Sequence, residues 1–434
     1  MTSRAALNAH AQQQQKQERA MTAAVDQPAK RGFTLNRWTL LTVAALAMAA
    51  MFVTGILMRV LQESGGTNSY ALLAEAFLHG RFDVDRCFDG DCAMVAGHGY
   101  VIFPPVPALV AMPFVALFGP NFAGFMIIGL LFFAGTLALW WRLFAAMGAR
   151  GDTRLWLMLA LGFGSPVYFI TLRADGIWFF AQVVGLFLLT LALHETLHKR
   201  LVAAGIAIGL AFLCRQMAIL VVPFLFALAL DRDEGLFSLN RASWWRKFIA
   251  LAIPVAAALI AYFVYNGARF GNPLETGYSY IVPDGHSYLG QRIAEALFSP
   301  RYVLFNLFYL FVQGFHAEFT GPLMTRLAGL DSNGTSLLAA SPFVLFAFFL
   351  PWRRDVVIAV VTALIIGGVT LFYHSNGYSQ YNVQRYTLDW LPLLFLFLPL
   401  TLTSERLPVF RLLVTYALFL NVVTMGVLAV TSGG

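Results

Sequence analysis

The chain has 434 residues, of which 59% are hydrophobic and 12% are charged, and its formal net charge is +7. Because a soluble domain carries about 25% charged residues, this composition leaves too little polar surface to face water and excludes an ordinary soluble enzyme. In a membrane protein, a positive net charge reflects Lys and Arg gathered in cytoplasmic loops, and we therefore expect membrane lipids and no nucleic acid as partners.

The N-terminal segment, residues 1–36, is polar and includes a Gln run at 12–15 and five Lys or Arg residues. Its composition predicts a disordered tail, because it has too few apolar residues to form a core. Its positive charge predicts a location in the cytoplasm. Residues 37–434 are expected to form a single transmembrane domain.

Long apolar runs, such as 40–57 and 122–139, show no alternation of polar and apolar residues. Lipid admits only helices and closed barrels, and barrel strands need such alternation, so these runs predict helices. The predicted fold class is an all-α integral membrane protein with about eleven transmembrane helices. The predicted spans are 39–61, 122–147, 155–172, 176–194, 201–214, 216–230, 247–265, 336–351, 355–373, 388–402 and 408–430.

Two other apolar runs, 104–118 and 302–315, are predicted to be interfacial helices that do not cross the membrane. If either run crossed, Arg groups that follow it, such as Arg142 or Arg353, would face outward against the positive-inside rule. The short runs 201–214 and 216–230 have an alternative, a single hairpin that dips to a shallow depth around Arg215. The resulting outer loops are about 62–121, 266–336 and 374–387.

The first outer loop is the segment richest in chemistry. Its residues 69–78 have apolar side chains at helical spacing, which predicts an interfacial helix along the membrane surface. A carboxylate beside a membrane-embedded cavity is what a general base needs to activate a hydroxyl. Taken singly, each acid of the loop also fits a solvated loop residue. The acids and histidines are Glu75, Asp83, Asp85, Asp89, Asp91, His79 and His98.

Two of the three cysteines, Cys87 and Cys92, lie in this same loop. The outer face of a cell membrane is oxidising, so a disulfide between them is the hypothesis, and two free thiols are the alternative. Cys214 is expected to be a packing residue within the membrane. The Cys, His and Asp residues do not follow a zinc-binding spacing, and we predict no structural zinc.

Several charged residues fall at or near the predicted outer ends of spans. Because a charge in lipid is costly, such residues usually face a cavity or a partner, although simple snorkelling to the headgroups is the alternative. Arg suits a phosphate, since its planar fork can donate two bonds to one group. The snorkelling interpretation is weakest for Arg215 and Arg385. The full set is Arg59, Arg173, Asp175, Arg215, Arg385 and Asp389.

Three regions together carry a family resemblance. The first contains YALLAEAFLHGRFDVD and DCAMVAGHGYVIFPPVPALVAMPFVALFG, the second GLAFLCRQMAILVVPFLFAL and YNGARFGNPLETGYSY, and the third QRYTLDWLPLLFLFLPL. The chain resembles the GT-C superfamily of polytopic glycosyltransferases, and within it the bacterial relatives of protein mannosyltransferases and lipid A aminoarabinose transferases. The resemblance implies a helix bundle with interfacial helices in the first outer loop, which supplies the catalytic carboxylate.

The chain departs from the family at one place. Many members carry an acidic pair about four residues before the Tyr of the interfacial helix, whereas residues 65–68 here read Gly-Gly-Thr-Asn. The replacement we expect for the base is Asp91, which precedes the GHGYVIFPP segment, with Glu75 as the second choice. By the same resemblance, Arg215 and Arg385 are expected to bind the phosphate of the lipid donor.

The resemblance implies a hexosyl- or pentosyltransferase of the cytoplasmic membrane with its active site on the outer face, and the distribution of Lys and Arg predicts that its N-terminus is inside. It would move a sugar from a polyprenyl phosphate to a hydroxyl on a glycan, lipid or protein. Direct displacement opposite the phosphate needs no covalent intermediate, so we expect inversion. A divalent metal is compatible with this chemistry, but the sequence has no clear ligand set for one. The alternatives are a flippase or transporter of a lipid-linked sugar and a non-catalytic membrane scaffold.

Overall fold

The computed structural model describes residues 36–88, 92–231, 233–281, 286–375 and 384–431. The chain divides into two units, residues 1–43 and residues 44–434. The described part of the first unit, 36–43, contains the beginning of helix α2. The predicted disordered tail lies outside the described residues except for Asn36, and so do Asp89 and Asp91.

The chain is mostly helical, as the apolar runs predicted. Among the described residues, six helices are long and apolar enough to cross a membrane. They support a membrane-embedded protein, because a soluble fold would need to cover such helices with polar residues. The six are α2 (Arg37–Gln62), α5 (Phe125–Ala146), α8 (Ile177–Leu197), α11 (Ala242–Phe270), α15 (Arg354–Leu371) and α17 (Leu407–Thr431).

The other five predicted spans fall on shorter or broken helices, so the predicted count of eleven is not confirmed. Proline accounts for most of the breaks, since it lacks an N–H and tends to begin a helix. Pro166 precedes α7, for example, and Pro223 opens α10. The short elements are α6 (Gly151–Gly162), α7 (Val167–Leu172), α9 (Leu201–Phe212), η1 (Gln216–Val221), α10 (Val222–Ala229), α14 (Leu337–Ala340), η5 (Pro342–Phe349), η6 (Arg385–Asp389), α16 (Leu391–Phe395) and η7 (Leu398–Thr401).

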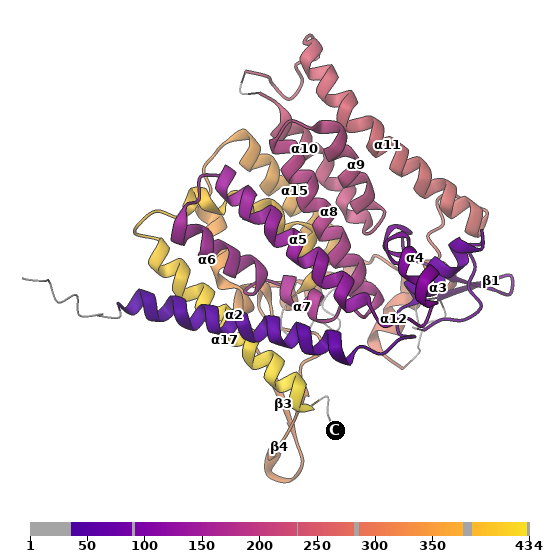
Figure 1. The fold of residues 1–434 in the computed structure, drawn as a ribbon, viewed down its shortest axis with the longest axis horizontal. Coiled ribbons are helices and arrows are strands. Elements are labelled where there is room, and N and C mark those ends of the chain that lie inside the picture. Colours follow the sequence, from indigo (N-terminus) through magenta and orange to yellow (C-terminus); the bar gives the residue numbers. More distant parts are fainter. Residues whose placement is uncertain (1–35, 89–91, 232, 282–285, 376–383, 432–434) are drawn as a thin grey trace, which may run out of the picture. The chain divides into compact units, whose positions relative to one another are not determined.

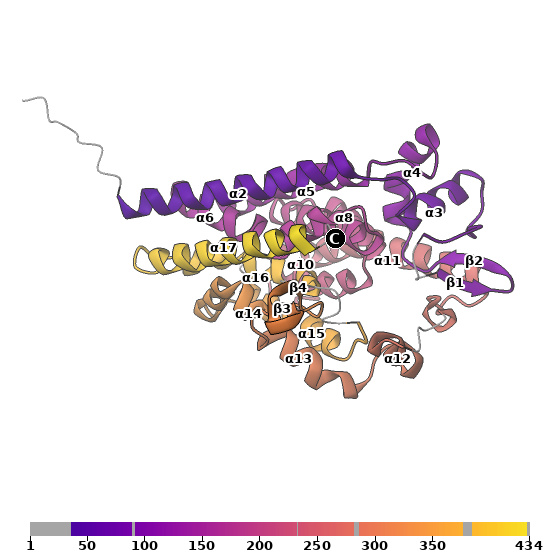
Figure 2. The same cartoon turned by 90° about the horizontal axis from the view of Figure 1, so that it is seen from below.

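The predicted interfacial segments are helical. Helix α3 (Ser69–Leu78) has the predicted bounds, and Asn68 caps it by accepting a hydrogen bond from the Tyr70 N–H at 3.0 Å. Figure 2 shows α3 beside α4 (Val106–Phe118), near the β1–β2 hairpin. The second interfacial run contains α13 (Val303–Phe311), and the remaining short elements are η2 (Tyr278–Tyr280), α12 (Tyr288–Glu295), η3 (Pro300–Tyr302) and η4 (Pro322–Met324).

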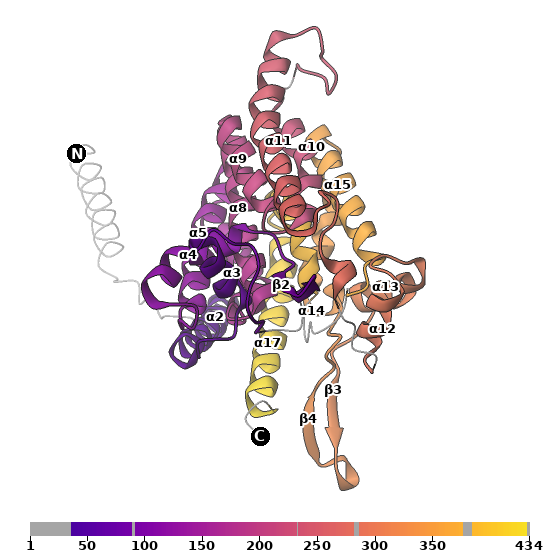
Figure 3. The ribbon, with the colours of Figure 1, turned by 90° about the vertical axis from the view of Figure 1, so that its right-hand side faces the viewer.

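Two hairpins correct the all-α prediction. Strands β1 (Cys92–Val95) and β2 (His98–Val101) are antiparallel, with Cys92 opposite Val101. The turn between them is Ala96-Gly97, and both residues have positive φ, as a tight two-residue hairpin turn requires. Strands β3 (Ala317–Thr320) and β4 (Arg326–Leu330) form the second hairpin, which Figure 3 shows projecting away from the helices.

Helix α11 links two ends of the larger unit. Its N-terminal half packs closely against α9, because a Cβ atom at Gly205 would lie only 2.7 Å from the Leu251 carbonyl oxygen. Its C-terminal Arg269 donates a hydrogen bond to the Val101 carbonyl of β2 at 2.8 Å. With 29 residues, α11 is about 43 Å long. The β1–β2 hairpin and the turn that precedes α11 therefore lie at opposite ends of this helix (Figure 1).

Candidate functional site

A buried ion pair joins two segments that are far apart in the sequence. Arg215 lies between α9 and η1, and Asp389 is the last residue of η6. Arg215 donates from Nε to Oδ1 at 2.7 Å and from Nη2 to Oδ2 at 2.6 Å. This bidentate geometry fixes the plane of the Arg215 guanidinium group, and the third nitrogen of that group, Nη1, takes no part in the ion pair.

Arg385, the first residue of η6, lies beside this pair and is bound to α8. It donates from Nη1 to the Gln182 Oε1 at 3.1 Å, and the Gln182 Nε2 donates back to the Arg385 carbonyl at 3.3 Å. Gln182 is the sixth residue of α8, which puts it about 8 Å along the helix from its start. The side chains of Arg385 and Gln182 thus lie within an apolar helix bundle, where charged side chains are costly.

The ring of Tyr386 lies close to both arginines. The guanidinium carbon is 4.8 Å from the ring centroid for Arg385 and 5.4 Å for Arg215. An aromatic face attracts cations, so the ring offsets part of the repulsion between the two arginines. The structure therefore brings the two predicted phosphate-binding residues together, with Asp389 occupying one edge of Arg215.

A small cavity adjoins the ion pair. Its free volume is about 20 Å³, room for about one water molecule and too little for a sugar phosphate. A donor would have to bind at its margin or after a rearrangement. The lining residues are Gln182, Gly185, Leu186, Leu189, Ala211, Arg215, Ala218, Leu388 and Asp389.

Tyr70 connects helix α3 to this region. Its ring centroid is 6.3 Å from those of Phe103 and Phe180, the latter on α8. The Tyr70 hydroxyl is buried, has no hydrogen-bond partner among the described residues, and is within electrostatic range of Arg215. Helix α3 and the arginine pair thus share one neighbourhood.

Of the two candidate bases, the structure describes one. Glu75 is half-buried on α3 and forms no ion pair with a described residue. Its backbone carbonyl is hydrogen-bonded to His79, which lies beyond the end of the helix. Asp91 lies outside the described residues, immediately before strand β1.

Two other acids of the same segment have structural roles. Asp83 lies 3.1 Å from His98 on β2, and Asp85 lies 3.3 Å from Arg81. The hydrogen bond from His98 holds the pKa of Asp83 below its usual range. Val84, between them, bridges to Gly99 of the hairpin. These contacts attach the chain that follows α3 to the β1–β2 hairpin.

Two glycines before helix α3 have backbone positions that restrict side chains. A Cβ atom at Gly65 would lie 1.6 Å from the Asn121 carbonyl oxygen, so no side chain fits there, and Gly66 has a φ of +78°. The nearest upstream acid, Glu63, accepts hydrogen bonds from the N–H groups of Phe125 and Met126 at 2.8 and 3.0 Å. Burial raises the pKa of Glu63. It caps α5 and is occupied by that role.

Cys87 and Cys92 are joined by a disulfide in the structure, and Cys214 is buried. The disulfide ties the start of β1 to the chain that follows α3. Within the described ranges, no group of three or more His, Cys, Asp or Glu side chains is arranged to hold a metal ion.

Two neighbours of the arginines were not singled out as site residues from the sequence, namely Gln182 and the ring of Tyr386. Gln182 carried a usable signal, because it is the one amide within the apolar run of α8. Asp389 was noted as a charge near a span end, but its pairing with Arg215 joins residues 174 positions apart. No local pattern indicates such a pair.

The chain matches no protein-family model, no curated protein and no solved structure. Its functional interpretation therefore rests on the residues and contacts described above.

Proposed function

We propose that this protein is a membrane glycosyltransferase of the GT-C type, which moves a hexosyl or pentosyl group from a polyprenyl phosphate to a hydroxyl of a glycan, lipid or protein. The observation that carries the proposal is the gathering of Arg215, Arg385 and Asp389 at one buried place beside α8. Buried charges in an apolar bundle are costly, and they usually mark a functional site.

The three side chains carry a net charge of +1, the difference between two guanidinium groups and one carboxylate. A phosphate complements that charge, and a preorganised guanidinium stabilises the negative charge that develops as the sugar leaves. Asp389 holds Arg215 in place. Asp91, or alternatively Glu75, takes the proton of the acceptor hydroxyl, which attacks opposite the phosphate and inverts the anomeric carbon.

The proposed location is the cytoplasmic membrane, with the N-terminus inside and the active site on the outer face. The distribution of basic residues supports this orientation, because Lys199, Arg200, Arg246 and Lys247 gather at the end of α11 that is remote from the β1–β2 hairpin. The positive-inside rule assigns that basic end to the cytoplasm.

The orientation predicts opposite labelling at two exposed positions. Met94 lies in the β1–β2 hairpin, and Phe237 lies in the turn before α11. In intact cells, an impermeant maleimide should label a Met94→Cys variant but should label a Phe237→Cys variant only after the membrane is permeabilised. Labelling of both variants from the same side would contradict the orientation.

The enzymatic proposal predicts a product. The purified protein in nanodiscs, supplied with polyprenyl-phosphate sugars and acceptor extracts, should release free polyprenyl phosphate, measured by thin-layer chromatography. Arg385→Lys keeps the charge but loses the fork, so it should lower turnover by about tenfold or more. Arg142→Lys, on the exposed side of α5, is the matched control and should leave turnover unchanged. Full activity of Arg385→Lys would remove this residue from the donor site.

A flippase for a lipid-linked sugar is the second candidate. The observation in its favour is that both oxygens of Asp389 are bound by Arg215, so the carboxylate nearest the arginines is not free to act as a base. A flippase would move the donor across the membrane and release no free polyprenyl phosphate. A non-catalytic scaffold would do neither.

A further inference from the structure

A second polar region lies at the opposite end of the helices from the β1–β2 hairpin. There, α9 and α11 both begin, and together they line a groove with a volume of about 650 Å³. This is within the usual range for ligand-binding pockets. The groove residues are Lys199, Arg200, Leu201, Val202, Ala203, Ile206, Ser243, Arg246, Lys247 and Ala250.

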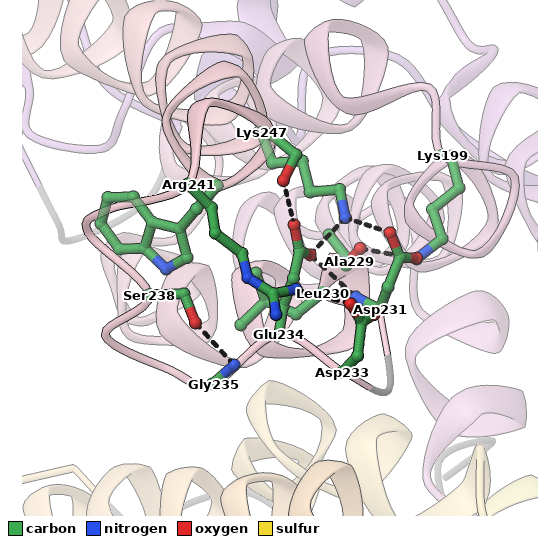
Figure 4. A network of polar contacts seen from close by, with 12 residues as sticks. Lys199, Ala229, Leu230, Asp231, Asp233, Glu234, Gly235, Ser238, Arg241 and Lys247 are labelled. Carbon is green, nitrogen blue, oxygen red and sulfur yellow. Dashed lines mark hydrogen bonds and ion pairs between the residues drawn. The ribbon is translucent and has the colours of Figure 1, made fainter.

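The basic side chains of the groove are held in place by acids around it. Figure 4 shows the Lys247 ammonium between the carboxylates of Asp231 and Glu234, at 2.6 and 2.5 Å. Lys199 reaches Asp231 at 3.1 Å. Lys247 and Ser243 hold the pKa of Glu234 low, at about 2, so this carboxylate stays charged at neutral pH.

One cation that lines the groove has no acid partner among the described residues. Four cations line the groove, namely Lys199, Arg200, Arg246 and Lys247. Lys199 and Lys247 pair with Asp231 and Glu234 as described, and Arg200 pairs with Glu195 at 2.5 Å. Arg246 is exposed and forms no ion pair with a described residue. Of the four lining cations, Arg246 is therefore the one without an acid partner in the described part of the chain. The first turns of α9 and α11 also present their N–H groups at this end, which favours an anion.

The other part of the groove is apolar. Val202 and Ile206 on α9 are 54% and 50% exposed, and Ala250 of α11 lies beside them in the groove lining. From Arg200 to Ile206 the helix rises about 9 Å. The groove lining thus runs from basic side chains at the start of α9 and α11 to apolar side chains farther along both helices.

We propose that this groove binds one anionic phospholipid, with its phosphodiester at Arg246 and an acyl chain along Val202, Ile206 and Ala250. A headgroup with one negative charge matches the guanidinium of Arg246, which has no acid partner among the described residues, and the apolar side of the groove fits a chain. A free phosphate ion would contact the basic side chains of the groove but not its apolar side chains. The proposal does not depend on the glycosyltransferase activity.

The test is native mass spectrometry of the full chain in detergent, titrated with phosphatidylglycerol or phosphatidylcholine of identical acyl chains. Wild type should retain one molecule of phosphatidylglycerol and should prefer it to phosphatidylcholine by at least about fivefold, the effect expected for one basic residue. Arg246→Gln should lose this preference, and Arg142→Gln, the matched control with the same charge change, should keep it.

A second variant separates the groove from general charge attraction. Ala250→Phe fills the apolar side of the groove and leaves every charge in place, so it should lower phosphatidylglycerol occupancy severalfold. Equal retention of both lipids by wild type would overturn the proposal, as would unchanged occupancy in Ala250→Phe. Displacement of the lipid by millimolar inorganic phosphate would also overturn it, because the site would then be one for a small anion.

Discussion

Asp91→Asn will lower turnover by about 10²–10⁴-fold while leaving donor binding intact, since this is the usual contribution of a general base. The exchange of a carboxylate for an amide is nearly isosteric, so the fold should be preserved. If Glu75 is the base instead, Glu75→Gln will show the same loss of turnover. Glu75 is half-buried on α3, whose Tyr70 is within electrostatic range of Arg215.

The measurement is initial rate of polyprenyl phosphate release, together with donor affinity from a separate binding assay. Asp85→Asn is the matched control, because its carboxylate is 83% exposed and pairs only with Arg81 among the described residues. If Asp91→Asn is active and Glu75→Gln is not, the base is Glu75. Full activity in both variants would show that neither carboxylate is the base.

Asp389→Asn will lower the free energy of unfolding by about 3–5 kcal/mol, the usual cost of leaving one member of a buried ion pair without its partner. Arg215 would keep its charge in a buried site and lose two charge-assisted hydrogen bonds of 2.6 and 2.7 Å. Unfolding of the protein in detergent, followed by helix content, measures this change.

The control is Glu295→Gln, which removes a solvent-exposed ion pair with Arg301. Pairs of that kind contribute about 0–1 kcal/mol. A double variant, Arg215→Met with Asp389→Leu, replaces the buried pair by apolar side chains of similar size. It should recover most of the lost stability, because apolar groups at this position need no charge partner. It should bind no donor, because the guanidinium group of Arg215 is gone. An Asp389→Asn variant as stable as wild type would show that the pair does not stabilise the fold.

Elements that depend on local sequence could be predicted from the chain itself. The apolar runs that became α2, α5, α8, α11, α15 and α17 were recognised because a long apolar segment in lipid can only satisfy its backbone as a helix. Helix α3 had the predicted bounds for a similar reason, since its apolar spacing is a local signal, and the structure shows in addition that Asn68 caps it.

The length of an apolar run did not predict a continuous helix where proline interrupts the run. The run 155–172 breaks between α6 and α7, where Pro166 cannot donate a backbone hydrogen bond. The β1–β2 hairpin was also missed, because its short strands depend on pairing with each other and on contacts such as the bond from Arg269 to Val101.

The candidate site could be predicted only in part from the sequence, and the rest of it was decided by the tertiary structure. The sequence by itself singled out Arg215, because a charge within an apolar stretch is costly wherever the chain folds. It singled out Arg385 as a charge near the end of a predicted span, among polar and aromatic residues. Only the tertiary structure paired Arg215 with Asp389, put Gln182 against Arg385, and packed Gly65 against the Asn121 carbonyl oxygen. The physical reason is that these contacts join segments far apart in the chain, and their partners are chosen by helix packing, which leaves no local sequence pattern.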